Sequence, residues 1–425
     1  MIGTSLAIAL APLNLTVAVV EAVARGDTQQ PSFDDRSTAL SRSTQRMFEA
    51  LGLWPEIVAA STPITAIQVS DKGRFGFAHI DAAEQKVEAL GYVVIYRVLG
   101  QVLQRHLEAL TNVDIICPGK ITAVAQRDDS VAVTVSQETG ERVCTGSLLV
   151  AADGANSTVR DLVGISASRV DYEQWAVIGN LQPEKAPENR AFERFTEDGP
   201  IAMLPVADDR AAFVWMMSPD RAKHILALGD EDFTSELQET FGYRLGRFSK
   251  VGQRAAYPLA LTKTNGLIAR RSVVVGNAAH GLHPVAAQGF NLGMRDVAAL
   301  CDCVAEAMAA GRTDAGAAAV LERYAEWRKS DQSKVLRFTD GLVRLFGDRR
   351  APARILRNVS MLGFDLIPGV RRFFARPTMG LAGRLPRWSR GVRLDCGPVT
   401  ASGSPAAAWS DCPGVVGCRG VRPFA

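Results

Sequence analysis

The segment from 273 to 296, Val-Val-Val-Gly-Asn-Ala-Ala-His-Gly-Leu-His-Pro-Val-Ala-Ala-Gln-Gly-Phe-Asn-Leu-Gly-Met-Arg-Asp, is rich in residues that could bind a charged ligand. Gly276 and Asn277 follow a run of valines that predicts a buried strand. Pro284, Gln288 and Gly289 then favour a loop that opens into a helix. The first turn of a helix has free backbone N–H groups and a positive dipole end. The sequence therefore predicts a site for negative charge at this turn.

Two histidines of this segment, His280 and His283, could act as a catalytic base. Loop histidines bonded to the backbone are the interpretation we favour, so no catalytic residue can be named. Cys301 and Cys303 lie two residues apart on the predicted helix and face different directions, which indicates structural roles. We predict no metal site, because the histidines and cysteines lack metal-ligand spacing.

The start of the chain holds a second pattern that could bind a nucleotide. A doubly wound dinucleotide site needs a strand, Gly-x-Gly-x-x-Gly, a helix, a second strand and then an acid. Here Gly3 could be the third glycine, residues 4–11 the helix, and Glu21 the acid that ends an apolar strand. The first strand and two glycines are absent, so a plain helix and strand with an edge glutamate is an equal alternative.

The third pattern is Leu148-Leu-Val-Ala-Ala-Asp-Gly-Ala-Asn-Ser-Thr-Val-Arg160. It predicts a buried strand that ends at Asp153 and Gly154, followed by a sharp turn into a helix. This spacing is unusual for a bare turn and favours a binding role. The alternative is that Asp153 only caps the helix.

The composition of the chain limits the classes of protein to which it can belong. The 425 residues have a formal charge of +3, with 47% hydrophobic and 22% charged residues, which excludes wholesale disorder and fibrous repeats. We find no transmembrane span, and residues 1–20 lack the basic start of a signal peptide. Seven cysteines at scattered spacings do not form a disulfide framework, so we predict a cytoplasmic protein.

Positive charge is concentrated near the end of the chain. Residues 341–393 contain twelve arginines, no lysine and two acids, a net charge of +10. Interleaved with apolar residues, this region could contact an anionic membrane surface or an acidic partner, and a solvated helix face is the equal alternative. We predict no nucleic-acid binding, because the rest of the chain is acidic and shows no known binding module.

Together the three patterns resemble the FAD-dependent aromatic hydroxylases of the p-hydroxybenzoate hydroxylase fold. Within that family the chain is most similar to the ubiquinone-biosynthesis branch, of the 2-polyprenyl-6-methoxyphenol hydroxylase type. Asparagine at 277, where most of the family has aspartate, is typical of that type. The passages that carry the resemblance are Asp35-Asp-Arg-Ser-Thr-Ala-Leu-Ser, Ala89-Leu-Gly-Tyr-Val-Val, Tyr172-Glu-Gln-Trp-Ala-Val-Ile, Ala191-Phe-Glu-Arg-Phe-Thr-Glu-Asp-Gly-Pro-Ile-Ala-Met-Leu-Pro205 and Gln288-Gly-Phe-Asn-Leu-Gly-Met-Arg-Asp296.

The resemblance implies a role for each matching residue in binding FAD. Glu21 would bind the adenosine ribose, and Asn277, beside Gly276, would contact the ribityl chain as a neutral amide. The segment at Asp153 and Gly154 would serve both FAD and NAD(P)H. The remaining cofactor-binding residues that the resemblance implies are Gly3, Arg36, Gln101, Pro284, Gln288, Gly289 and Asn291.

The implied chemistry is that of the cofactor. NAD(P)H would reduce FAD, and a flavin C4a-hydroperoxide formed with O2 would hydroxylate the ring of a polyprenyl phenol, while the protein positions the ring and excludes water. A sister enzyme acting at another ring position and a non-catalytic flavoprotein subunit are the alternatives. Candidate pocket walls, which could equally be sheet core, are Phe192, Phe195, Met203, Leu204 and Trp215.

We therefore predict an α/β protein with a Rossmann-like FAD-binding domain whose first strand is missing, an inserted, mainly antiparallel substrate layer, and C-terminal helices. Its FAD-binding domain would comprise 1–165 and 265–340, its substrate layer 166–264, its basic helical region 341–395 and a disordered tail 396–425. Met1 matches a methionine inside the family's glycine motif, so we expect an N-terminally truncated chain that retains FAD weakly. Because a polyprenyl substrate is membrane-borne, the basic region could contact the inner membrane or a ubiquinone-biosynthesis complex.

Overall fold

The computed structural model describes residues 1–24, 36–73, 77–282, 287–347, 375–394 and 415–419. His283 and Pro284 lie outside these residues, as does much of the predicted basic region. Within the described ranges, no helix combines the length and the apolarity that crossing a bilayer requires.

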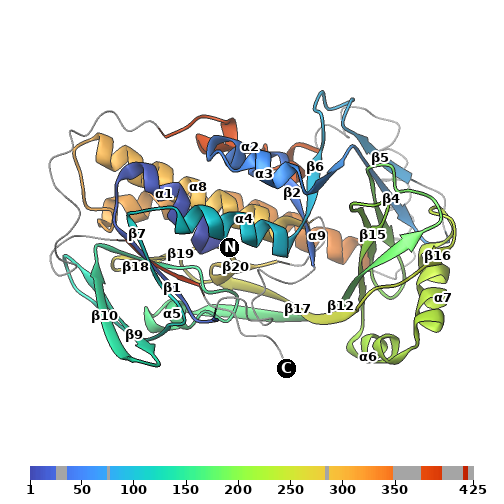
Figure 1. Ribbon diagram of the computed structural model, residues 1–425, viewed down its shortest axis with the longest axis horizontal. Helices are drawn as coiled ribbons and strands as arrows, with labels where there is room; N and C mark the ends of the chain where they lie inside the picture. Colours follow the sequence, from blue (N-terminus) through green and yellow to red (C-terminus); the bar gives the residue numbers. More distant parts are fainter. Residues whose placement is uncertain (25–35, 74–76, 283–286, 348–374, 395–414, 420–425) are drawn as a thin grey trace.

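A six-stranded sheet forms the half of the molecule that contains the N-terminus (Figure 1). Its strands are parallel except for the first edge pair, and the apolar runs predicted at 15–22, 148–152 and 272–275 all lie in it, as expected for strands buried on both faces. The order is β18 (Ile268–Ala269), β19 (Ser272–Val274), β11 (Leu148–Ala151), β21 (Val415–Arg419), β1 (Val17–Glu21) and β7 (Val113–Ile116).

Strand β21 corrects the prediction that 396–425 forms a tail without structure. Residues 415–419 pair in parallel with β1 on one side and with β11 on the other. The gap between β1 and β11 exposes backbone donors and acceptors on both sides, and a short Val-Val segment with high strand propensity satisfies them. A strand from the end of the chain thus occupies the centre of this sheet.

Helices cover one side of the six-stranded sheet, and an antiparallel three-stranded sheet with a short helix covers the other (Figure 1). Small and apolar residues of the first helix allow it to pack closely on the strands, and residues 3–10 are all buried. The helices are α1 (Ile2–Leu10), α4 (Tyr96–Glu108), α8 (Gln288–Ala309) and α9 (Ala318–Gly347), and the opposite layer contains β8 (Lys120–Gln126), β9 (Val131–Gln137), β10 (Gly140–Gly146) and α5 (Thr158–Leu162). Helix α9 continues past residue 340, where the sequence predicts the boundary between the FAD-binding domain and the basic helical region.

The second half is built on a nine-stranded sheet that is antiparallel except where β13 pairs with β4. Three of its strands, β4, β5 and β20, come from stretches that the sequence places in the FAD-binding domain, because local pattern does not reveal a pairing partner so distant in the chain. The strands are β20 (His280–Gly281), β17 (Ala255–Thr264), β12 (Ala167–Pro183), β15 (Ala211–Met217), β14 (Ile201–Pro205), β13 (Arg190–Phe195), β4 (Ala66–Asp71) and β5 (Phe77–Asp81), with β16 (Phe248–Ser249) beside β12.

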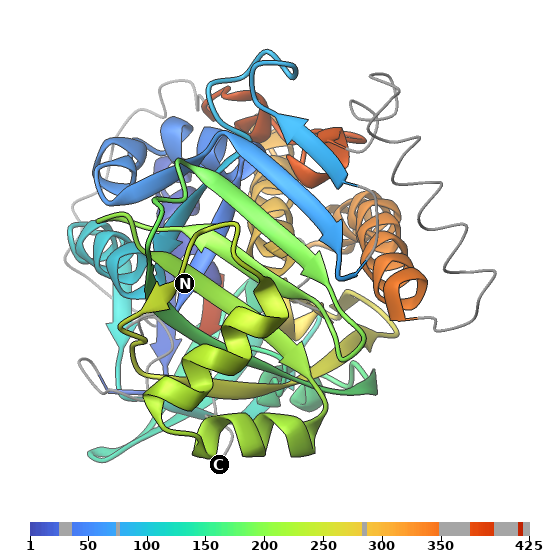
Figure 2. The same cartoon turned by 90° about the vertical axis from the view of Figure 1, so that its right-hand side faces the viewer.

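Two helices, α6 (Pro219–Ala227) and α7 (Asp230–Phe241), cover the outer face of this sheet, as Figure 2 shows. The long strands β12 and β17 connect the sheet to the first half (Figure 1). A further group of elements lies above the junction of the two halves in Figure 1: β2 (Ser37–Ser41), α2 (Arg42–Ala50), α3 (Trp54–Val58), β3 (Ser61–Ile64) and β6 (Gly91–Ile95).

Candidate functional site

Three segments far apart in the sequence meet at the N-terminus of α1. A Cβ atom added to Gly276 would lie 3.2 Å from Ile2 Cγ1, and one added to Gly293 would lie 2.8 Å from Ile2 Cδ1 and 3.2 Å from Gly276 Cα. Gly276 also has a φ of +59°, a conformation that favours glycine. The start of the chain, the turn after β19 and the first turns of α8 therefore contact one another, as the sequence patterns require.

Both helices that meet here begin without a side-chain cap. Helix α1 starts after Met1 and helix α8 after Ala287, and neither of these side chains caps the backbone N–H groups of the first turn. Uncapped N–H groups and two positive dipole ends favour an anionic ligand. Gly3 is buried in the first turn of α1, and the exposed Asn277 lies in the adjoining 3-10 turn, Gly276–Ala278. These features fit the pyrophosphate and flavin of FAD.

Glu21 ends β1 at the carboxyl edge of the parallel sheet. Its side chain is 8% exposed, and Oε1 accepts a hydrogen bond from Val23 N at 3.3 Å. Its backbone carbonyl accepts a hydrogen bond from Gly119 N at 2.8 Å. The carboxyl edge beside a helix N-terminus is where doubly wound sheets bind nucleotides, so this position suits the ribose role that the resemblance implies.

Asp153 supports the first turn of the helix that follows it, whose N-cap is Ser157. Its carboxylate accepts hydrogen bonds from the Ser157 hydroxyl and from Val159 N, the latter at 3.1 Å. Burial raises the pKa of Asp153, while the Ser157 and Val159 bonds oppose that shift. Gly154 has a φ of +89° and makes the turn.

The capped segment is also tied to the turn after β19. Arg160 Nη1 donates to the carbonyls of Ala155 at 3.0 Å and Ala278 at 3.2 Å, so one guanidinium joins the two segments. This contact places the Asp153 region beside the converging helices. A cofactor contact of Asp153 or Gly154 stays a prediction.

Arg36 lies where the two halves of the molecule meet. Its guanidinium stacks over the ring of Tyr257 at 4.7 Å and lies 5.6 Å from the ring centre of Tyr96. Tyr96 in turn makes an edge-to-face contact with Phe290 in the first turn of α8. Arg36 thus connects β17 with the site, whereas Gln101 lies exposed on α4 and its predicted FAD contact remains untested.

Asn291 and Gln288 organise the start of α8. Asn291 Oδ1 accepts from Ser41 N at 2.8 Å and from the Thr44 hydroxyl at 2.7 Å, and its Nδ2 donates to Ala39 O and Ala287 O at 2.8 Å. The side chain of Asn291 therefore ties α8 to β2 and α2. Gln288 Nε2 donates to Thr378 O at 3.2 Å, and Gly289 has open space where a Cβ would lie.

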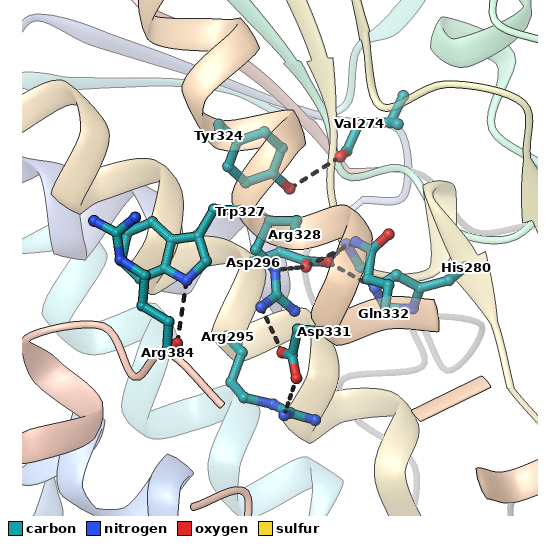
Figure 3. Close-up of polar contacts among 11 residues, drawn as sticks. Val274, His280, Arg295, Asp296, Tyr324, Trp327, Arg328, Asp331, Gln332 and Arg384 are labelled. Carbon is teal, nitrogen blue, oxygen red and sulfur yellow. Dashed lines mark hydrogen bonds and ion pairs between the residues drawn. The ribbon is translucent and has the colours of Figure 1, made fainter. Parts of the chain in front are cut away.

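A buried carboxylate that sequence reasoning missed, Asp296, supports the turn from behind (Figure 3). Its Oδ2 accepts from Gly276 N at 3.0 Å and lies 2.6 Å from His280 Nε2. Its Oδ1 accepts from Arg328 Nε at 2.7 Å and from Gln332 Nε2 at 3.0 Å. Burial alone would raise the pKa of Asp296, but His280 and Arg328 outweigh it and hold the pKa well below the usual range.

His280 has a partner that neither sequence interpretation foresaw. It is 1% exposed and bonded to the carboxylate of Asp296 rather than to the backbone. This position, enclosed behind the turn, gives it a structural role. Cys301 and Cys303 are both buried and free, which agrees with the structural roles predicted for them.

The candidate pocket walls divide between the two faces of the nine-stranded sheet. Phe192, Met203 and Trp215 pack with the aromatic residues of α7 in a core on the outer face, so the core interpretation is the right one for them. Leu204 and Phe195 lie on the inner face. Sequence pattern could have separated the two sets, because alternate residues of a strand point to opposite faces.

The matching family model carries the description FAD binding domain and covers residues 1–339. Ubiquinone hydroxylase UbiL of Rhodospirillum rubrum is 36% identical over 93% of this chain and 91% of its own length, and 3-demethoxyubiquinol 3-hydroxylase of Escherichia coli is 31% identical over 90% and 96%. The crystal structure of p-nitrophenol 4-monooxygenase PnpA from Pseudomonas putida superposes with a TM-score of 0.74 at 19% identity, over 90% of this chain and 96% of that one, which shows the shared fold. The chain belongs to the FAD-binding domain family, and FAD is its cofactor.

Proposed function

We propose that this protein is an FAD-dependent monooxygenase that hydroxylates the ring of a polyprenyl phenol in ubiquinone biosynthesis, with NAD(P)H and O2 as co-substrates. The observation that carries the proposal is the convergence of the α1 N-terminus, the Gly276 turn and the start of α8. The similarity to two ubiquinone-pathway hydroxylases over most of their length supports the choice of substrate class.

Each feature of the site then has a task toward the cofactor. The backbone N–H of Gly3 would face the pyrophosphate, Glu21 would hold the ribose hydroxyls, and Asn277 would bond the ribityl chain. The start of α8 would stabilise negative charge on the flavin ring. When bound, FAD supplies the electron transfer from NAD(P)H and the activation of O2.

The substrate ring would lie between the start of α8 and the inner face of the nine-stranded sheet. Arg36, stacked on Tyr257, lies at this junction. Which ring carbon is hydroxylated depends on how the pocket orients the phenol, so a sister reaction at another ring position remains the alternative within the same chemistry.

Substitution of Gly289 by alanine tests the site separately from the scaffold. A Cβ there meets nothing within 4 Å, and alanine favours a helix by up to about 1 kcal/mol, so the protein should fold at least as well. A flavin ring lying over this turn would collide with the methyl group, and we expect FAD affinity to fall at least tenfold. Gly341→Ala, an exposed and equally open helical position in α9, is the matched control and should retain FAD.

The same preparations test the activity, because NAD(P)H oxidation can be followed with and without a monoprenyl methoxyphenol. Phenol-stimulated oxidation with hydroxylated product supports the enzyme. Bound FAD without any stimulation or product would instead indicate a non-catalytic flavoprotein subunit. Equal FAD affinity in Gly289→Ala and Gly341→Ala would contradict the proposed position of the flavin.

A membrane-borne substrate gives the basic region a task as well. We propose that arginines within 341–393 hold the protein at an anionic membrane surface, or in a complex of pathway enzymes. Deleting 341–425 would also remove β21, so replacing arginines of 349–372 with glutamine is the cleaner change. Loss of sedimentation with phosphatidylglycerol vesicles supports the membrane contact, and unchanged sedimentation would refute it.

A further inference from the structure

Glu193 on β13 places a carboxyl group beside apolar neighbours on the inner face of the nine-stranded sheet. The two neighbours of Glu193 in the strand point outward: Phe192 packs against Phe241, and Arg194 Nη1 donates to the Phe241 carbonyl at 2.5 Å. Glu193 must therefore point to the opposite, inner face.

Strand register identifies what surrounds Glu193 on that face. Val69 of β4 and Ala202 of β14 are its lateral partners. Ala202 pairs with Val214, and the next row of the same face runs from Met216 through Ala176 to Tyr257. Tyr257 is the ring on which Arg36 stacks, so Glu193 shares a face with the contact that borders the start of α8.

One oxygen of the Glu193 carboxyl is enclosed without a group to satisfy it among the described residues. Oε1 is enclosed and has no hydrogen-bond partner in the part of the chain that the structure describes, while the residue as a whole keeps some accessible surface. Burial raises the pKa of Glu193 to about 7, and no neighbouring charge contributes. The other titratable groups of this face are Asp71, two register positions along at the end of β4, and Tyr257 with Arg36 at the far side.

A buried polar group without a partner is costly and needs an explanation. A carboxyl group that titrates near neutral pH and faces an apolar surface is suited to accept a hydrogen bond, and then a proton, from a weakly acidic ligand. A phenol has a flat apolar ring and one weakly acidic hydroxyl, and so matches both properties.

We propose that Glu193 binds the hydroxyl group of the phenolic substrate and accepts its proton during ring hydroxylation. The inference rests on the proposed function and assigns the base that the sequence could not name. The O–H bond of the phenol breaks, the proton goes to the Glu193 carboxylate, and the electron pair stays on the phenol oxygen. The ring carbon ortho or para to that oxygen becomes more nucleophilic and takes one oxygen atom of O2.

The remaining atoms balance with the co-substrates already named. The carbon that gains oxygen loses its hydrogen as a proton when the ring becomes aromatic again. NAD(P)H supplies two electrons and one hydrogen as a hydride, and with one proton from solution the second oxygen atom leaves as water. The proton lost by the ring carbon is balanced by that of the new hydroxyl group. Glu193 returns its proton to the phenol oxygen of the product and is again a carboxylate for the next turnover.

Two substitutions separate binding of the hydroxyl from proton transfer. Glu193→Gln keeps a hydrogen-bond acceptor but cannot take a proton, so kcat should fall about 100-fold or more with little change in KM. Glu193→Leu also loses the acceptor. We therefore expect it to lose the preference for the phenol over its O-methyl ether, about tenfold or more in binding affinity for the wild-type protein.

The experiment uses the FAD-loaded protein and a monoprenyl methoxyphenol. In the wild-type protein kcat/KM should rise with pH through about 7, because only the ionised carboxyl accepts a proton, and Glu193→Gln should lack this rise. Calorimetric titration with the phenol and its methyl ether, without NAD(P)H, gives the binding preference independently of turnover. Glu197→Gln, the same change at an exposed position four residues on, is the control.

The outcomes distinguish this inference from the proposed function. A wild-type protein that neither binds nor hydroxylates the phenol overturns the function itself. A wild-type protein that does both, with Glu193→Gln equal to it in kcat and pH profile, overturns the role of Glu193 alone. Unfolding temperatures identify any variant that fails to fold.

Discussion

Asp296 and Glu193 are both carboxyl groups withdrawn from water, in different halves of the molecule and with opposite consequences. Asp296, behind the Gly276 turn, accepts hydrogen bonds from that turn and from Arg328 and Gln332, and lies against His280. Its pKa lies well below the usual range. Glu193, on the inner face of the nine-stranded sheet, has no such partner for its enclosed oxygen among the residues that the structure describes, and burial raises its pKa to about 7.

The difference separates a structural carboxylate from a reactive one. A carboxylate whose lone pairs are all occupied holds its surroundings in place and stays ionised at any physiological pH. A carboxyl without partners titrates near neutral pH and can exchange a proton with a ligand. The half with the parallel sheet thus uses the buried charge of Asp296 to fix a turn, and the half with the nine-stranded sheet leaves the Glu193 carboxyl available.

Among variants that test this difference between the two carboxyl groups, Asp296→Asn should have the largest effect on stability. The amide cannot balance the buried guanidinium of Arg328, and breaking a buried ion pair on one side costs about 3–5 kcal/mol. The denaturation midpoint should fall accordingly, and FAD should bind more weakly because the Gly276 turn loses its anchor. Asp161→Asn, which affects an ion pair of Arg160 with a largely exposed carboxylate, should cost less than about 1 kcal/mol. Equal losses in the two variants would contradict the structural role of Asp296.

A smaller effect of opposite sign is expected for Glu193→Gln when stability is measured against pH. The folded-state pKa of Glu193 lies above its unfolded value, so the folded protein loses stability as pH rises from about 4.5 to 7. Glutamine removes that loss, and the variant should be more stable than the wild type by about 3 kcal/mol at pH 8 and nearly equal to it at about pH 4. Asp296→Asn should cost the same at pH 5 and pH 8, since the stabilising charge of Asp296 is lost only below pH 3.8. Unfolding temperatures at these pH values check both statements, and a Glu193→Gln gain independent of pH would exclude the assigned titration.

Sequence pattern was sufficient to predict the helices and strands that are determined by residues close together in the chain. The helix at 158–162, the small-residue helix at the start of the chain and the strand that ends in Glu21 lie where periodicity and turn residues place them. Their positions also fixed much of the candidate site, because the carboxyl ends of parallel strands meet at one edge of a sheet.

The rest depends on contacts between distant residues, which no local pattern contains. Asp296 is a charged residue in a helix and would ordinarily face water, and only its packing against Arg328 reveals its burial. Strand β21 lies in a segment with the composition of a tail, and only the open edges of β1 and β11 give it a place. Glu193 could have been noticed as the one acid between Phe192 and Phe195, but the face it points to depends on α7.

The smallest effect concerns Asp153, a carboxylate intermediate between the other two because it has partners yet keeps a raised pKa. Ser157→Ala removes a hydroxyl that donates to Asp153 and accepts from Arg160 N at 2.9 Å. Loss of the cap should cost about 1 kcal/mol. Because the lost bond opposed the rise in the Asp153 pKa, the cost should be larger at pH 7 than at pH 4. Ser218→Ala removes the same kind of cap from α6, where the hydroxyl accepts from Arg221 N, and its cost should not depend on pH in this way. If the stability cost of Ser157→Ala equals that of Ser218→Ala at every pH, the backbone alone satisfies Asp153. Asp153 would then be a structural carboxylate like Asp296, and not an intermediate between Asp296 and Glu193.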